Sequence, residues 1–157
     1  MTKLLAVTSS LASFCLLALA AGCGTNAAST TIDDGALAGM VYGQPWTFQA
    51  GGTDAFLSEG DDNFFATFYA SAFTCGSSEP SGPSLIVAVP KVPGDYPMSL
   101  MRNMTFVMGS DNKVAIDGRV VVDSVTATTV TGGLVGTLDD QNTVSGQFTL
   151  TVCPSTN

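Results

Sequence analysis

Two-residue alternation of apolar and polar side chains is the dominant pattern of this chain from Leu37 onward. Short apolar runs are bounded by Gly, Pro, Asn and Asp, and no window shows the i, i+3, i+4, i+7 spacing of an amphipathic helix. The strands that this pattern predicts are 38–42, 46–50, 64–73, 85–89, 104–108, 114–123, 130–138 and 144–152. We therefore expect an all-β domain over 37–157, a single antiparallel β-sandwich or flattened barrel of about eight to ten strands.

The stretch 64–73 is the most aromatic of these strands and is predicted to lie at the centre of the core. Its alternation gives one apolar face and one semi-polar face. The apolar face carries Phe64, Ala66, Phe68 and Ala70, and the semi-polar face carries Phe65, Thr67, Tyr69 and Ser71. A loop rich in Gly, Ser and Pro follows at 76–84.

The C-terminal third is the most regular part of the chain and predicts an antiparallel meander of three long strands. The inward positions of the first strand are Val114, Ile116, Gly118, Val120 and Val122. The strands 130–138 and 144–152 follow, joined by a tight turn at 139–142. The glycines at 118, 132 and 136 predict points where bent strands approach closely or bulge.

The first predicted hairpin turns at Gly43-Gln44-Pro45 and carries the chain's single tryptophan. Pro45 fits the start of a strand, where its missing N–H donor does no harm. Trp46 and Phe48 share one face. Two interpretations of Trp46 stay open, a plug in the core and a platform on which a carbohydrate ring stacks.

The N-terminal 22 residues have the features of a secretory signal peptide. Lys3 gives a short positive start, and an apolar stretch broken by Ser and Thr is too short to span a bilayer. The run Leu19-Ala20-Ala21-Gly22-Cys23 resembles the lipobox of bacterial lipoproteins, although Ala20 stands where that family more often has Leu. The resemblance implies cleavage before Cys23 and acylation of its sulfur and amino group. An ordinary secreted protein, with Cys23 a bystander, is the alternative.

Residues 23–36 are predicted to be the lipidated cysteine and a flexible linker, because the stretch is small and polar without an apolar period. The two or three acyl chains that the resemblance implies would anchor the protein durably, at roughly 0.8 kcal/mol for each buried methylene. Gly24 follows the cysteine where an Asp tends to retain Gram-negative family members at the inner membrane. The resemblance therefore implies attachment to the outer membrane through Cys23.

Charge and composition narrow the function classes. The chain has five basic and thirteen acidic residues, a formal net charge of −8, and loss of Lys3 with the signal makes it one unit more negative. Nucleic acid and acidic headgroups are disfavoured as partners, because both are bound through Lys and Arg. The chain has no histidine, so Ser-His-Asp and Cys-His catalysis and His-ligated zinc are excluded. We expect a non-catalytic protein without a cofactor.

Cysteine parity predicts one disulfide. Cys15 leaves with the signal and lipidation uses Cys23, so Cys75 and Cys153 remain as a pair in an oxidising compartment. Two free buried thiols are the alternative. Two thiols without histidine are too few ligands for a metal site.

Two acidic turns are weak candidates for Ca²⁺ binding. Asp61 and Asp62 lie in one turn, and Asp139 and Asp140 lie in the other. Ca²⁺ binds six to eight oxygen ligands, and carboxylates supply such oxygens. Neither turn matches the EF-hand spacing. Solvated carboxylates that form the turns are the alternative interpretation.

The segments 43–48 (GQPWTF), 89–97 (VPKVPGDYP) and 144–153 (VSGQFTLTVC) resemble recurring segments of small β-rich lipoproteins of the Gram-negative envelope. The resemblance implies a β-sandwich or flattened barrel and no catalytic residues. We expect a membrane-anchored envelope lipoprotein with a non-catalytic binding or structural role, whose protein or small-molecule partner the sequence does not identify. The alternative is a small-ligand carrier in a lipocalin-like β-barrel, if the inward glycines open a cavity.

Overall fold

The computed structural model describes residues 31–154, and this part of the chain is all-β. Its eleven strands are β1 (Ala38–Val41), β2 (Gln44–Thr47), β3 (Ala50–Asp54), β4 (Asn63–Tyr69), β5 (Ser84–Pro90), β6 (Gly94–Pro97), β7 (Met104–Met108), β8 (Asp111–Ala115), β9 (Asp117–Val125), β10 (Thr129–Asp139) and β11 (Asn142–Thr151). Within the described residues, no helix is long and apolar enough to cross a membrane. The predicted all-β class is confirmed.

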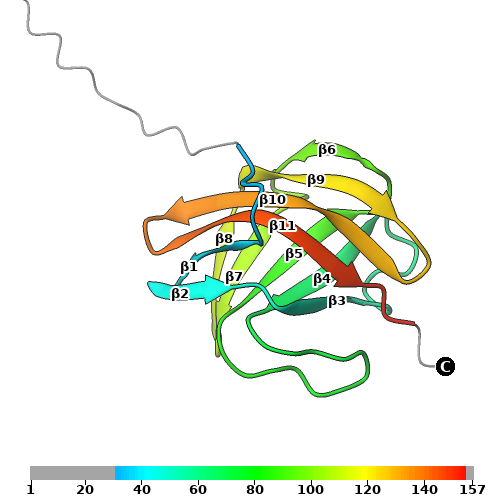
Figure 1. Ribbon diagram of the computed structural model, residues 1–157, viewed down its shortest axis with the longest axis horizontal. Helices are drawn as coiled ribbons and strands as arrows, with labels where there is room; N and C mark the ends of the chain where they lie inside the picture. The colour runs from blue at the N-terminus through cyan, green and yellow to red at the C-terminus, as the bar shows by residue number, and fades with distance from the viewer. Residues whose placement is uncertain (1–30, 155–157) are drawn as a thin grey trace, which may run out of the picture.

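The strands form one curled, open sheet in the order β6-β9-β10-β11-β3-β4-β5-β7-β8, with β1 on β11 and β2 on β1 (Figure 1). The predicted meander is present as β9, β10 and β11. The expectation of a purely antiparallel sheet is wrong at one junction, because β3 and β11 run parallel where Gly52 pairs with Thr151. This junction joins the N-terminal and C-terminal halves of the sheet.

The concave side of the sheet is filled by large apolar side chains. Phe68 has no exposed surface, and its ring lies 5.4 Å from that of Phe48 and 5.3 Å from that of Phe148 between centroids. The predicted apolar face of the aromatic strand is confirmed at Phe64, Ala66 and Phe68, but β4 ends at Tyr69, so Ala70 lies beyond the strand. Trp46 is also in the core, with only 2% of its surface exposed and its Nε1 donating to the Pro83 carbonyl at 3.0 Å. Its burial leaves no ring face for stacking a sugar.

The prediction of one strand over 114–123 is wrong, because the chain turns a corner at Ile116. β8 ends before this residue and pairs with β7, whereas β9 begins after it and pairs with β10 and β6. Val114 and Ile116 are about half exposed, and Ala115 is the buried residue of β8. The alternation changes phase at the corner, so that Val120 and Val122 again face the core.

The inward glycines bring strands together instead of opening a cavity. Gly132 stands at a β-bulge between β9 and β10, where an added Cβ would lie 2.0 Å from the Val121 carbonyl oxygen. At Gly136 a Cβ would lie 2.2 Å from Cε of Met104, which fills the space over this glycine. Neighbouring atoms therefore already occupy the space that a side chain at either glycine would take.

The part of the predicted linker that the structure describes lies along β11. Gly35 accepts a hydrogen bond from the Gln147 amide at 2.8 Å, and the Asp33 amide donates to Ser145 Oγ at 2.9 Å. A parallel bridge joins Ala36 to Gln147. Residues 33–36 are thus attached to β11 by backbone and side-chain hydrogen bonds, and residues 1–30 of the predicted signal and linker lie outside the described range.

Candidate binding groove

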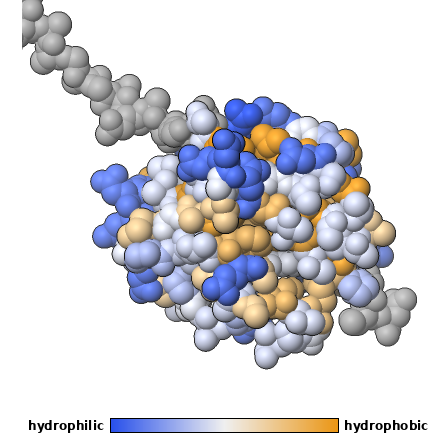
Figure 2. Space-filling view, in the orientation of Figure 1, coloured by the Kyte–Doolittle hydropathy of each residue, from blue (hydrophilic) through white to orange (hydrophobic). Residues whose placement is uncertain are grey.

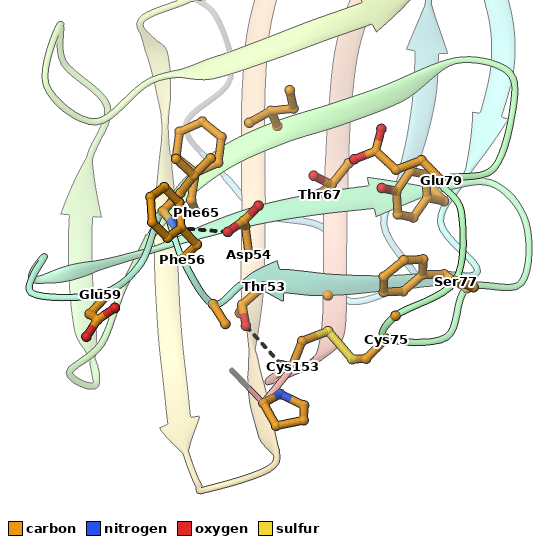
Figure 3. Close-up of a pocket in the computed structure, with 18 residues that line it drawn as sticks. Thr53, Asp54, Phe56, Glu59, Phe65, Thr67, Cys75, Ser77, Glu79 and Cys153 are labelled. Carbon is orange, nitrogen blue, oxygen red and sulfur yellow. Dashed lines mark hydrogen bonds between the residues drawn. A yellow bond between two sulfur atoms is a disulfide. The ribbon is translucent and has the colours of Figure 1, made fainter. Parts of the chain in front are cut away.

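A groove of about 720 Å³ lies on the outer face of β3, β4 and β5, away from the filled core (Figure 3). Its floor is the semi-polar face of the aromatic strand, represented by Phe65, Thr67 and Tyr69. These residues alternate with the core residues of β4, so the same strand supplies both sides of the sheet. The groove therefore stands on the best-packed part of the domain.

Strand register places the floor residues in cross-strand rows. Phe65 pairs with Asp54 on β3 and Ala88 on β5, and Thr67 pairs with Gly52 and Ile86 in the same way. Directly opposite residues on antiparallel strands present their side chains to the same face. The middle row is shallow because Gly52 has no side chain and Thr67 has a short one.

The absent side chain at Gly52 allows the wall of the groove to reach the sheet. An added Cβ at Gly52 would lie 2.6 Å from Cε1 of Phe73 and 2.9 Å from Sγ of Cys153. Phe73 also packs against Tyr69, with ring centroids 5.1 Å apart. Any larger residue at position 52 would push this aromatic pair and the cysteine off the strand.

The disulfide expected from the sequence forms part of the same wall. Cys75 and Cys153 are bonded, with their Cα atoms 5.5 Å apart and a separation of 78 residues in the sequence. The bond ties the start of the 76–84 loop to the residues that follow β11, and both cysteines line the groove. The amide of Cys153 donates to Thr53 Oγ1 at 3.0 Å, which holds this end of the chain against β3.

The loop between β3 and β4 forms the opposite wall and is held by internal hydrogen bonds. Asp54 Oδ1 accepts from the Leu57 amide at 2.8 Å, and the buried Ser58 Oγ accepts from the Phe65 amide at 2.9 Å. Lys91 Nζ donates to the carbonyls of Ser58 at 2.5 Å and Asp61 at 2.7 Å. The loop is thus fixed by the hydrogen bonds of the Asp54, Ser58 and Lys91 side chains.

This fixed loop leaves large apolar side chains in solvent. Phe56 is 83% exposed and Leu57 is 51% exposed, and Figure 3 shows Phe56 beside Phe65 at one end of the groove. Polar residues normally occupy the tips of such loops. Phe56, Leu57 and Phe65 thus form an exposed apolar cluster at this end of the groove.

A second hollow of about 190 Å³ continues the groove toward β7. Leu57, Phe65 and Ile86 line both hollows. The far side is closed by Met101, which is 89% exposed at the tip of a turn in which the Ser99 amide donates to the Arg102 carbonyl at 2.7 Å. The two hollows together make an elongated strip of mixed polar and apolar residues across neighbouring strands.

Among the described residues, the charged side chains that line the larger groove are all acidic, namely Asp54, Glu59 and Glu79. Figure 3 shows Asp54 near Phe65 and Glu79 above Thr67 at the other end. Burial raises the pKa of the Tyr69 hydroxyl, and the negative charge of Glu79 raises that pKa further. The phenol is therefore neutral at physiological pH.

The structure places the predicted Ca²⁺ candidates in two separate turns. Asp61 Oδ1 accepts from the amide of Asn63 at 2.8 Å, and Asp139 Oδ1 accepts from Nδ2 of Asn142 at 2.7 Å. These hydrogen bonds are the main cause of the lowered pKa of both carboxyl groups. Asp62 and Asp140 are exposed neighbours in the same turns. Over residues 31–154, no three acidic, cysteine or histidine residues gather as metal ligands would.

Of the other predicted site residues, the cysteine pair lies in the groove wall, and Cys23 lies outside the described residues. Sequence reasoning missed the groove itself. The available signal was the placement of Phe65 and Tyr69 on the outward face of a strand whose other face was already apolar. Large aromatic side chains on both faces of a strand indicate that something covers each face.

No protein-family model, curated protein or solved structure matches the chain. The chemistry of the groove is therefore drawn from its own side chains.

Proposed function

We propose that the protein is a lipid-anchored lipoprotein of the bacterial outer membrane whose β-domain is a non-catalytic binding module. The preformed groove on the outer face of β3, β4 and β5 is the observation that carries the binding role. Such sites combine apolar walls with a few placed polar groups, and this groove joins Phe65 and Phe73 with Asp54 and Glu79. The lipobox-like run ending in Cys23 supports the anchor.

A binding site on the outside of the sheet is supported better than a carrier cavity inside it. Phe68, Phe106 and Leu134 have no exposed surface and occupy the concave side. Met104 covers Gly136, one of the glycines whose small size would have made room for a ligand. A lipocalin-like carrier would need this core to be hollow.

The surface of the domain agrees with a protein that works at an interface. Figure 2 shows apolar residues between polar ones on the face that it presents, with polar residues along the upper and left margins. Several large apolar side chains are exposed on the described part of the chain, among them Phe56, Leu100 and Met101. Of these, Phe56 lines the larger hollow and Met101 the smaller one, so both lie where a partner in the groove would contact them.

Replacement of Cys23 tests the anchor. Cys23→Ser removes the sulfur that receives the lipid, so we expect metabolic labelling with a fatty acid to disappear and the uncleaved precursor or a soluble form to accumulate. Cys15→Ser is the matched control, because Cys15 lies within the signal and its loss should leave labelling unchanged. Labelling that persists in Cys23→Ser would show that the protein is not a lipoprotein of this kind.

A further inference from the structure

We propose that the groove binds an extended, basic segment of a partner protein in which Lys or Arg alternates with apolar residues. This inference rests on the proposed binding function and specifies the occupant of the same site. The basic character follows from the charges of the described residues, and the extended conformation follows from the shape of the strip.

The basic side chains of the described range are already engaged within the domain. Lys91 donates to two loop carbonyls, and Arg102 lies with Cζ 4.9 Å from the centroid of the Tyr96 ring. Lys113 Nζ is 3.8 Å from a carboxylate oxygen of Asp139, and Arg119 pairs with Asp95. None of the groove carboxylates forms an ion pair with a basic side chain of the described residues. A partner with positive charge would therefore complement the groove.

A basic side chain in the groove could contact both its aromatic rings and its carboxylates. Phe65 is 40% exposed beside Asp54, and Phe73 in the groove wall is partly exposed, whereas Tyr69, which packs against Phe73, is only 5% exposed. A Lys or Arg side chain laid over such a ring gains a cation–π contact while its charge meets the nearby carboxylate. An acidic segment would gain neither contact and would be repelled by the net charge of −8.

The shape of the strip favours an extended chain over a compact molecule. The two joined hollows cross the outer faces of β3, β4, β5 and β7, which are neighbours in the sheet. Three inter-strand spacings of about 4.8 Å make a strip of roughly 14 Å, the length of about four residues in extended conformation. Apolar side chains of such a segment would contact Leu57 and Met101, which stand in solvent on either side.

A pair of synthetic peptides tests this occupant on the full-length lipidated protein in a non-ionic detergent. The probes are fluorescein-labelled decapeptides of alternating Lys and Val and of alternating Glu and Val. Fluorescence polarisation should show binding of the basic peptide that weakens as salt is raised, because the contacts include charge pairs. Equal binding of the acidic peptide, or no binding of either, would overturn the proposal.

Charge variants locate the binding. Asp54→Asn with Glu79→Gln removes two groove charges while keeping the hydrogen-bond acceptor at position 54, and should weaken the basic peptide about tenfold. Asp117→Asn with Asp123→Asn removes the same charge from exposed positions on β9 and should leave binding within about twofold. Equal losses in both double variants would show non-specific attraction to an acidic protein and overturn the site.

A variant that fills the groove without changing its charge tests whether the peptide binds inside the groove. Thr67→Trp fills the middle of the floor, and we expect the basic peptide to lose binding while the melting temperature stays close to that of the wild type. Thr149→Trp, at an exposed position of β11, is the matched control and should bind normally.

Full displacement of the peptide by equimolar spermine would identify a small organic cation as the occupant and overturn the peptide proposal. Fatty-acid labelling is independent of all these results, so a failure here leaves the lipid anchor standing.

Discussion

Phe68 lies at the centre of the core, because two other aromatic rings pack against it and none of its surface is exposed. Truncation to alanine would leave a cavity between Phe48 and Phe148 that the surrounding strands cannot close. We expect Phe68→Ala to lower the free energy of unfolding by about 3–5 kcal/mol, measured by urea denaturation.

Phe65 supplies the control for this prediction from the same strand. Its side chain lies on the groove face and is 40% exposed, so Phe65→Ala removes fewer packed contacts. We expect its effect on unfolding to be well below that of Phe68→Ala. Equal losses at the two positions would contradict the assignment of the two faces of β4.

Asp139 stabilises the turn between β10 and β11 in a way that depends on pH. Asn142, which is fully buried, donates from Nδ2 to the Asp139 carboxylate, and the Gln141 amide donates to the same oxygen at 3.0 Å. These bonds favour the charged form, which is why the pKa of Asp139 is lowered from its ordinary value of 3.8.

The sign of the pH effect follows from this lowered pKa. A carboxyl group whose folded pKa is depressed stabilises the native state above its unfolded pKa and loses that contribution as pH falls through the folded value. We expect Asp139→Ala to lower the melting temperature at pH 7 and the difference from wild type to shrink as pH falls below 3.8. A difference that stays constant down to pH 2 would show that the charge has no part in the turn.

At the scale of the strand, alternation in the sequence predicted the faces of β4 and β11, whose buried residues alternate along the strand. It did not hold in β10, where the residues from Gly132 to Gly136 are all buried and Leu138 is 43% exposed. It failed at 114–123, where two half-strands of opposite phase meet at Ile116. The residues around this corner continue the apolar pattern of the strands on both sides. A change of sheet partner is a long-range event, and no local signal reported it.

Edge strands of the sheet carry the features that limit pairing with other chains. Pro45 lies in the edge strand β2, and Pro97 ends the edge strand β6. Each proline removes one backbone N–H donor from its edge. β8 carries Asp111, Asn112 and Lys113 at the other end of the sheet. This arrangement leaves the outer face of β3, β4 and β5, and not an exposed strand edge, as the surface suited to a partner.

Gly132 stands at the bulge where β9 and β10 change register, and a substitution there tests the pairing of these two strands. A Cβ at this position would meet the backbone oxygen of Val121, which cannot move without breaking the pairing of the two strands. We expect Gly132→Ala to lower the free energy of unfolding by about 1–3 kcal/mol in a urea titration.

Gly35 is the matched control for this substitution. No atom lies within 4 Å of the position that its Cβ would take, so Gly35→Ala should leave stability within about 0.5 kcal/mol of the wild type. If the two alanine variants unfold at the same urea concentration, the bulge glycine is not needed for the close approach of β9 and β10.

At the scale of the whole molecule, the core could be predicted from the sequence and the groove could not. The core is a property of local alternation, which Phe64 and Phe68 display. The groove combines the outer face of β4 with two loops and with Cys153, whose place beside Gly52 depends on the parallel junction of β3 and β11. Parity of the cysteines was the sequence feature that predicted the contact between Cys75 and Cys153 within one of its walls.

The disulfide connects the stability of the fold to the shape of the groove, since it holds the loop after β4 against the end of β11. Its closed loop is long, and the chain-entropy model gives on the order of 4 kcal/mol for such a cross-link. We expect the double variant Cys75→Ser, Cys153→Ser to melt at a lower temperature and to bind the basic peptide more weakly, because Phe73 and Glu79 lose their attachment. Mass spectrometry without reductant should find the wild type two hydrogens lighter than its reduced form. Alkylation of both thiols in the unfolded, unreduced protein would show that the bond is absent and that packing alone holds the groove wall in place.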